Sequence, residues 1–117
     1  MKRYLLPLIS LMLLTVNSSA SAENYPLANH IDKSESKLHQ LELRAGDRQM
    51  ILFVSPDNFL SDLNCVLKLN GEEVASDLDP DTAGCLMFYT PTVSGTYDLV
   101  ITNDSITPTN YKGYYNY

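Results

Sequence analysis

The chain has 117 residues and a formal net charge of 8 − 14 = −6, so it has room for one domain and excludes a two-domain enzyme. The acidic excess argues against nucleic-acid binding, because phosphate backbones are bound by Lys and Arg side chains that release counterions. It also argues against electrostatic docking on an anionic membrane.

The first 22 residues have the layout of a secretory signal peptide. Lys2 and Arg3 form a positive start, the apolar run 4–16 follows, and small residues end at Ala22, where we predict the cut. The run contains Pro7 and is shorter than the roughly 20 residues that a membrane-spanning helix needs. Removing the leader would leave a soluble chain with a charge of 6 − 14 = −8. We expect this chain in the periplasm or outside the cell.

The segment after the predicted cut, residues 23–36, is polar and shows no apolar period, so we expect a leading arm. Apolar runs between turn residues then predict a sandwich over residues 37–104. Six short strands are expected, over residues 37–44, 49–54, 65–69, 72–75, 85–89 and 96–102. The continuous run 49–54 fits either a strand buried on both sides or a sandwich core strand.

Asn70-Gly71 is a strong hairpin-turn signal between two of these strands. No helix of useful length is expected. Short strands with regularly spaced turns predict an all-β fold, a small antiparallel β-sandwich of jelly-roll type. The final segment, residues 105–117, is rich in tyrosine and is expected to be an edge strand or a tail.

Two cysteines, Cys65 and Cys85, lie in the predicted mature chain. Exported proteins meet oxidising conditions, so we expect a disulfide between them. Strand alternation supports this expectation, because Cys65 shares a face with Leu67 and Cys85 shares a face with Met87. The rival interpretation is a free catalytic thiol beside a histidine, and neither histidine has a sequence context that suggests it.

Three segments in a fixed order resemble the bacterial pre-peptidase C-terminal domain. They are Leu-Glu-Leu-Arg-Ala-Gly-Asp at 41–47, Asp-Leu-Asn-Cys-Val-Leu-Lys-Leu-Asn-Gly at 62–71, and Phe-Tyr-Thr-Pro-Thr-Val-Ser-Gly-Thr-Tyr-Asp-Leu-Val-Ile at 88–101. The resemblance implies a small jelly-roll sandwich of the kind appended to secreted proteases, where it aids secretion or holds substrate. Asn64 stands where the family has a second acidic residue, and we expect no protease to precede the domain. We therefore expect the domain to act alone or on a separate partner.

Five carboxylates lie close together in the sequence, namely Glu72, Glu73, Asp77, Asp79 and Asp81. The spacing of Asp77, Asp79 and Asp81 matches the first ligands of a calcium loop. The rest of that motif is missing, because its glycine is delayed to Gly84 and its twelfth position is Phe88. We expect a solvated acidic loop that keeps the sheet edge from aggregating, with calcium binding as the alternative.

Four tyrosines crowd the last seven residues, namely Tyr111, Tyr114, Tyr115 and Tyr117. Such rings suit recognition of sugars or proteins, and we select them with Glu72 and Glu73 as candidate partner-binding residues. The alternative is a final edge strand whose alternate rings cover the core. Both interpretations apply if Tyr115 and Tyr117 pack inward while Tyr114 points outward.

No catalytic constellation is recognisable around His30 or His39, and a zinc site would need more ligands than two histidines and a paired cysteine supply. We expect no enzyme and no cofactor. The leading hypothesis is an exported binding or accessory module that engages a secreted protein or a surface polymer. The alternative is a periplasmic inhibitor or immunity protein that blocks a basic enzyme or toxin. A small hydrolase is the third hypothesis, and it lacks a site.

Overall fold

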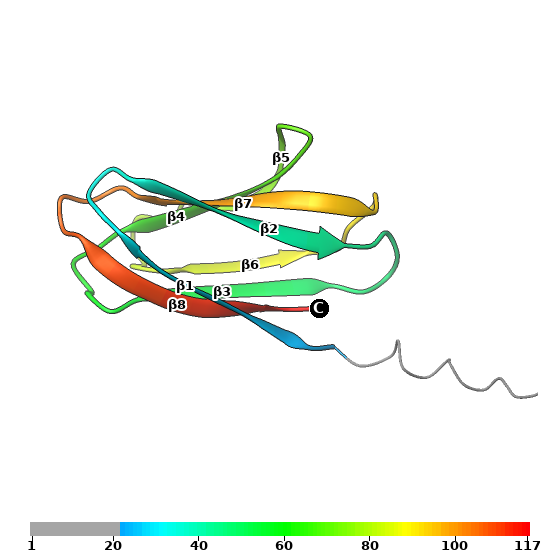
Figure 1. Ribbon diagram of the computed structural model, residues 1–117, viewed down its shortest axis with the longest axis horizontal. Coiled ribbons are helices and arrows are strands. Elements are labelled where there is room, and N and C mark those ends of the chain that lie inside the picture. Colours follow the sequence, from blue (N-terminus) through cyan, green and yellow to red (C-terminus); the bar gives the residue numbers. More distant parts are fainter. Residues whose placement is uncertain (1–21) are drawn as a thin grey trace, which may run out of the picture.

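The computed structural model describes residues 22–117, so the predicted signal peptide lies outside the described residues except for Ala22. Eight strands follow one another along the chain: β1 (Asn24–Ile31), β2 (Ser36–Leu43), β3 (Met50–Pro56), β4 (Leu63–Leu69), β5 (Glu72–Asp77), β6 (Cys85–Tyr89), β7 (Gly95–Asn103) and β8 (Thr109–Asn116). They form two packed sheets (Figure 1). Within residues 22–117, no helix is long and apolar enough to cross a membrane.

The strand order is β1-β8-β3-β6 in one sheet and β2-β7-β4-β5 in the other. All neighbours are antiparallel, and the strands pair in nested fashion, β1 with β8, β2 with β7, β3 with β6 and β4 with β5. This nested pairing of the first half of the chain with the second half is the jelly-roll topology, which contains two Greek keys. The predicted all-β sandwich is confirmed.

The core lies between the sheets and is built from alternate residues of each strand. On β7 the buried side chains include Tyr97, Leu99 and Ile101, while on β3 every second residue from Met50 is buried. Phe53, on the other face of β3, is 43% exposed. The run predicted at 49–54 is therefore a sandwich core strand that begins at Met50, and it is not buried on both sides.

The disulfide between Cys65 on β4 and Cys85 on β6 joins the two sheets. The Cα atoms are 6.2 Å apart, and both residues are buried in the core. No cysteine in the described part of the chain is free. The predicted pairing is confirmed, and strand alternation is the reason, because it turns both Cβ atoms toward the opposite sheet.

The turn between β4 and β5 also follows the prediction. Asn70 has a φ of +53° and Gly71 a φ of +84°, which are the two positive values that a tight hairpin turn requires. Leu69 pairs with Glu72 directly across this turn. The Asn-Gly dipeptide thus sets the position of the β4–β5 hairpin.

The prediction of a leading arm over residues 23–36 was wrong for most of its length. Strand β1, Asn24–Ile31, pairs with β8 along all of its residues. Only Leu27 and Ile31 of this strand are buried. Apolar and polar residues therefore do not alternate along β1, and the sequence pattern did not indicate a strand. Pro26 is tolerated because β1 is an edge strand and position 26 faces its open side, since Glu23 and Tyr117 exchange backbone hydrogen bonds and the pairing residues of β1 alternate from there.

The prediction that residues 105–117 form an edge strand or tail needs a second correction. Strand β8 lies between β1 and β3, so it is an inner strand of its sheet. The reason is β1 itself, which occupies the side of β8 that was expected to be open. The edges of this sheet are β1 and β6.

Candidate functional site

An apolar row crosses the outer face of the sheet that contains β6. The strand register places Pro26 beside Tyr114, Tyr114 beside Phe53, and Phe53 beside Leu86. The next pair toward the sheet end, Ile51 and Phe88, continues the apolar surface on β3 and β6. We call its exposed large side chains the outer patch, and they are Phe53, Leu86, Phe88 and Tyr114.

The side chains of the outer patch are large and apolar, and they are exposed to solvent. Leu86 and Phe88 are 52% and 54% exposed, and Tyr114 is 39% exposed. The ring centroids of Phe53 and Tyr114 are 6.1 Å apart, so these two rings contact one another across the strands. Contiguous exposed apolar surface on a soluble domain is a feature of interaction sites, so the outer patch is the candidate site.

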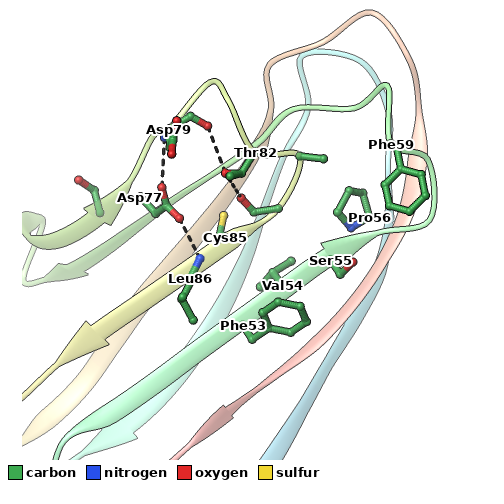
Figure 2. A pocket seen from close by; sticks show the side chains of 13 residues that line it. Phe53, Val54, Ser55, Pro56, Phe59, Asp77, Asp79, Thr82, Cys85 and Leu86 are labelled. Atoms are coloured by element: carbon green, nitrogen blue, oxygen red, sulfur yellow. Dashed lines mark hydrogen bonds between the residues drawn. The ribbon is translucent and has the colours of Figure 1, made fainter.

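A hollow of about 730 Å³ adjoins the outer patch at one end of β3 and β6. Phe53 and Leu86 belong to its lining, and Figure 2 shows Phe59 on the loop at one side and Asp77 with Asp79 on the other. A smaller hollow of about 400 Å³ lies on the far side of Phe53, where Lys112 and Tyr114 line it. Phe53 is therefore a ridge between two depressions.

The carboxylates of residues 72–81 lie in two different places. Asp77 and Asp79 line the larger hollow, whereas Glu72 and Glu73 lie at the start of β5 beside the hairpin turn and do not line it. The structure thus brings Asp77 and Asp79, but neither glutamate, next to the outer patch.

The aspartates act as acceptors for backbone N–H groups. Asp77 Oδ1 accepts a hydrogen bond from Asp79 N at 3.1 Å, and Asp79 Oδ1 accepts one from Asp81 N at 2.9 Å. Asp77 Oδ2 accepts a third from Leu86 N at 2.8 Å. These bonds order the loop, and the last one covers part of the β6 edge. Within residues 22–117, no three His, Cys, Asp or Glu side chains lie close enough to share a metal ion.

The four C-terminal tyrosines have different environments. Tyr111 is only 1% exposed, and its hydroxyl lies 2.6 Å from His39 Nε2. Tyr115 stacks on Tyr25 at 4.8 Å between centroids. The Tyr117 hydroxyl donates to the Arg44 carbonyl oxygen.

Tyr114 alone of these tyrosines belongs to the outer patch. The expectation that Tyr115 and Tyr117 pack against the core while Tyr114 points outward is confirmed. Burial takes Tyr111 out of any surface recognition and raises the pKa of its hydroxyl to about 12. The tyrosine segment therefore contributes one ring to the candidate binding surface.

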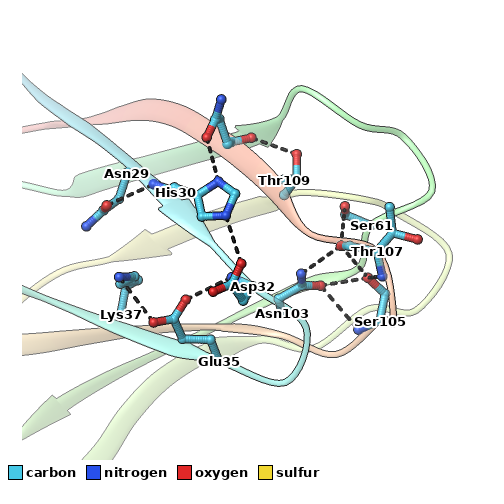
Figure 3. A network of polar contacts seen from close by, with 11 residues as sticks. Asn29, His30, Asp32, Glu35, Lys37, Ser61, Asn103, Ser105, Thr107 and Thr109 are labelled. Carbon is cyan, nitrogen blue, oxygen red and sulfur yellow. Dashed lines mark hydrogen bonds and ion pairs between the residues drawn. The ribbon is translucent and has the colours of Figure 1, made fainter.

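The two histidines have separate partners. His30 lies in a polar network on β1 (Figure 3), where Nδ1 is 2.8 Å from Asn110 Oδ1 and Nε2 is 2.9 Å from Asp32 Oδ1. Hydrogen bonds to Asn110 and Asp32 raise the pKa of His30. His39 lies on the other sheet, and burial lowers its pKa. Each ring is held by its own neighbours, in a place away from the outer patch.

Sequence reasoning missed Phe53, Leu86 and Phe88 as surface residues. A signal was present, because the runs 49–54 and 85–89 are apolar on both alternating faces, and one face of each must point away from the core. Only the register shows that these outward residues meet Tyr114 across three strands.

A comparison of the chain with protein-family models gives no match, and a comparison with curated protein sequences gives none either. The likeness to the pre-peptidase C-terminal domain therefore stays a prediction that rests on the segments within residues 41–101. The candidate site has apolar side chains at its centre and the carboxylates of Asp77 and Asp79 at one border.

Proposed function

We propose that this protein is an exported, non-enzymatic binding module whose outer patch engages a secreted protein. The observation that carries the proposal is the row from Tyr114 through Phe53 to Leu86, which exposes large apolar side chains on a rigid sheet face. Aromatic side chains at the centre of an interface contribute much of the binding energy, because they bury a large area and lose little conformational freedom. The partner would cover this row.

The resemblance to pre-peptidase C-terminal domains supports an accessory role of this kind, in which the module acts on a separate secreted protein. A surface polymer is the alternative partner, since Tyr and Phe rings also stack on sugars. The outer patch favours a protein, because Leu86 and Phe88 add aliphatic and phenyl surface without polar groups. A polysaccharide would leave its hydroxyls unpaired against such side chains.

A second candidate function, an inhibitor or immunity protein for a basic enzyme or toxin, has support from Asp77 and Asp79. These carboxylates border the hollow next to Phe53. Opposite charges at the rim of an interface speed association and select the partner. Both functions use the same surface, and they differ in whether binding blocks the activity of the partner.

Export is part of the proposal, and its support is the leader layout together with the Cys65–Cys85 disulfide, which is compatible with an oxidising location. Mass spectrometry of the protein purified from the native cell envelope and medium tests it. We expect a mature chain that begins at Glu23. A chain that still contains Met1 would contradict export by this leader.

The binding surface is tested by photocrosslinking in the native envelope and medium. A photoreactive p-benzoylphenylalanine is placed at residue 88 in the outer patch, or at residue 38 as a control, because Leu38 is 59% exposed on the opposite sheet. We expect a defined crosslinked protein from residue 88 and none from residue 38. Adding Phe53→Ser and Tyr114→Ser should abolish the crosslink in a protein that circular dichroism shows to be folded. Equal crosslinking from both positions, or a crosslink that survives the two serines, would contradict the proposal.

A further inference from the structure

Strand β6 is an open edge of unusual composition. It pairs with β3 on one side, and no strand among residues 22–117 pairs with its other side. Its sequence, Cys-Leu-Met-Phe-Tyr at 85–89, contains no charged residue and no proline. Natural proteins usually protect such edges with charges, proline or a covering loop, because an unprotected apolar edge is a template for another strand.

The backbone N–H and C=O groups of alternate β6 residues point to the open side of the strand. The N–H of Leu86 donates to Asp77 Oδ2 on β5, in the other sheet, and so it points away from β3. In an antiparallel ladder, residues two apart direct their N–H and C=O groups to the same side. The N–H and C=O of Phe88 and the C=O of Leu86 therefore point to the open edge, where an added strand would find a donor and two acceptors.

The hollow lies at the Leu86 end of the same edge. Its apolar lining includes Phe53, Phe59 and Leu86, and its carboxylates are Asp77 and Asp79. None of its lining residues is Lys, Arg or His. An apolar side chain can enter this hollow, and a cation on the same segment would lie beside the two aspartates.

Resting on the proposed function, we propose that the partner contributes an extended cationic segment that adds to β6 as an antiparallel strand. One apolar side chain of the segment occupies the hollow beside Phe53 and Phe59, and a Lys or Arg lies near Asp77 and Asp79. Charge complementarity selects this occupant over a second copy of the chain. Two copies of the mature chain, each with a net charge of 6 − 14 = −8 after the predicted cleavage, would repel one another. A second β6 strand paired at this edge would also carry no Lys or Arg to place beside the aspartates.

The probe is a fluorescein-labelled hexapeptide of alternating Val and Lys, whose binding is followed by fluorescence anisotropy at low salt. A Val–Glu hexapeptide of the same length is the charge control. Two N-methylated versions of the Val–Lys peptide test backbone pairing, one methylated at the Val amides and one at the Lys amides. In a strand added to an edge, only one of these two sets faces β6.

We expect the Val–Lys peptide to bind and the Val–Glu peptide not to bind. One methylated peptide should bind about tenfold or more weakly than the parent, because roughly two backbone bonds are lost, while the other should bind as the parent does. Equal binding of both methylated peptides, or binding of the Val–Glu peptide as tightly as the Val–Lys peptide, would overturn the proposal.

Two double variants locate the cationic contact. Asp77→Asn with Asp79→Asn removes two charges beside the hollow, while Glu72→Gln with Glu73→Gln removes two charges at the other end of β5. We expect the first pair to weaken binding of the Val–Lys peptide severalfold and to flatten its salt dependence, and the second pair to change little. Equal effects of the two double variants would mean that binding depends only on the net charge of the protein. The proposed location of the cation beside Asp77 and Asp79 would then be wrong.

The outcomes separate this inference from the proposed function. If residue 88 crosslinks a secreted protein and Phe53→Ser with Tyr114→Ser prevents it, while neither Val–Lys nor methylated peptides bind, the binding surface stands and strand addition is refuted. If sedimentation velocity shows a dimer that Phe88→Asp abolishes, the occupant of the edge is a second copy and the cationic segment is refuted.

Discussion

The carboxylate of Asp77, the last residue of β5, accepts a hydrogen bond at 2.8 Å from the backbone N–H of Leu86 on β6, although the two strands belong to different sheets. This bond occupies one of the outward-facing groups of an apolar edge strand. The acidic loop was predicted to keep the sheet edge from aggregating, and this hydrogen bond is the contact through which Asp77 would do so, at the Leu86 end of the edge.

Replacing Asp77 with Ala should leave the N–H of Leu86 without its acceptor, so that the β6 edge pairs more readily with a strand of another molecule. We expect Asp77→Ala to aggregate faster than the wild type on heating and to lose about 1 kcal/mol in the free energy of unfolding. Asp77→Asn keeps an acceptor oxygen and should aggregate at nearly the wild-type rate. Light scattering and urea denaturation measure these quantities, and identical behaviour of the Ala and Asn variants would show that the hydrogen bond has no protective effect.

The disulfide should contribute strongly to stability, because it joins the two sheets of a small domain. We expect Cys65→Ser with Cys85→Ser to lower the free energy of unfolding by about 3 kcal/mol, the amount that closure of such a loop supplies in the chain-entropy model. Urea denaturation measures the loss, and reduction of the wild type should reproduce it. A double variant as stable as the oxidised protein would contradict the prediction.

Gly113 on the inner strand β8 should be intolerant of any side chain. A Cβ at this position would overlap the carbonyl oxygen of Phe53 on the neighbouring strand, so Gly113→Ala must displace backbone and should cost about 3 kcal/mol. At Gly95 an added Cβ would meet only Leu69 Cδ1 at an ordinary 3.7 Å. Gly95→Ala should change stability by less than about 0.5 kcal/mol. Thermal unfolding of both variants tests this difference, which would vanish if β8 could shift freely.

The two histidines should titrate on opposite sides of their common reference pKa of 6.5. Hydrogen bonds to Asn110 and Asp32 raise the pKa of His30, so its stabilisation is complete below 6.5 and is lost as the pH rises through the raised value. Burial lowers the pKa of His39, so its stabilisation is present above 6.5 and is lost as the pH falls through the lowered value.

An NMR titration of the imidazole resonances measures both pKa values directly. His30→Gln should remove the loss of stability on the alkaline side of 6.5, and His39→Gln should reduce the loss on the acidic side. Finding both rings at the same pKa, or in the reverse order, would contradict the assigned environments of His30 and His39.

Local pattern was enough to predict several features of this fold. Alternation along the strands placed Cys65 and Cys85 on inward faces and Tyr114 on an outward face, because side-chain direction in a strand depends only on position. The Asn70-Gly71 turn was also predictable, since these residues readily adopt positive φ. These features depend on a few consecutive residues, so the sequence alone contains them.

Strand β1 and the outer patch were not predictable in this way. Leu27 and Ile31 are too sparse to signal a strand, and β1 forms because β8 supplies a complete ladder of partners from the far end of the chain. The row from Tyr114 through Phe53 to Leu86 likewise joins three segments that are distant in sequence. The amino-acid sequence determined which side chains point outward on each strand. Only the tertiary structure decided which of them meet, because strand order and register arise from contacts between remote segments.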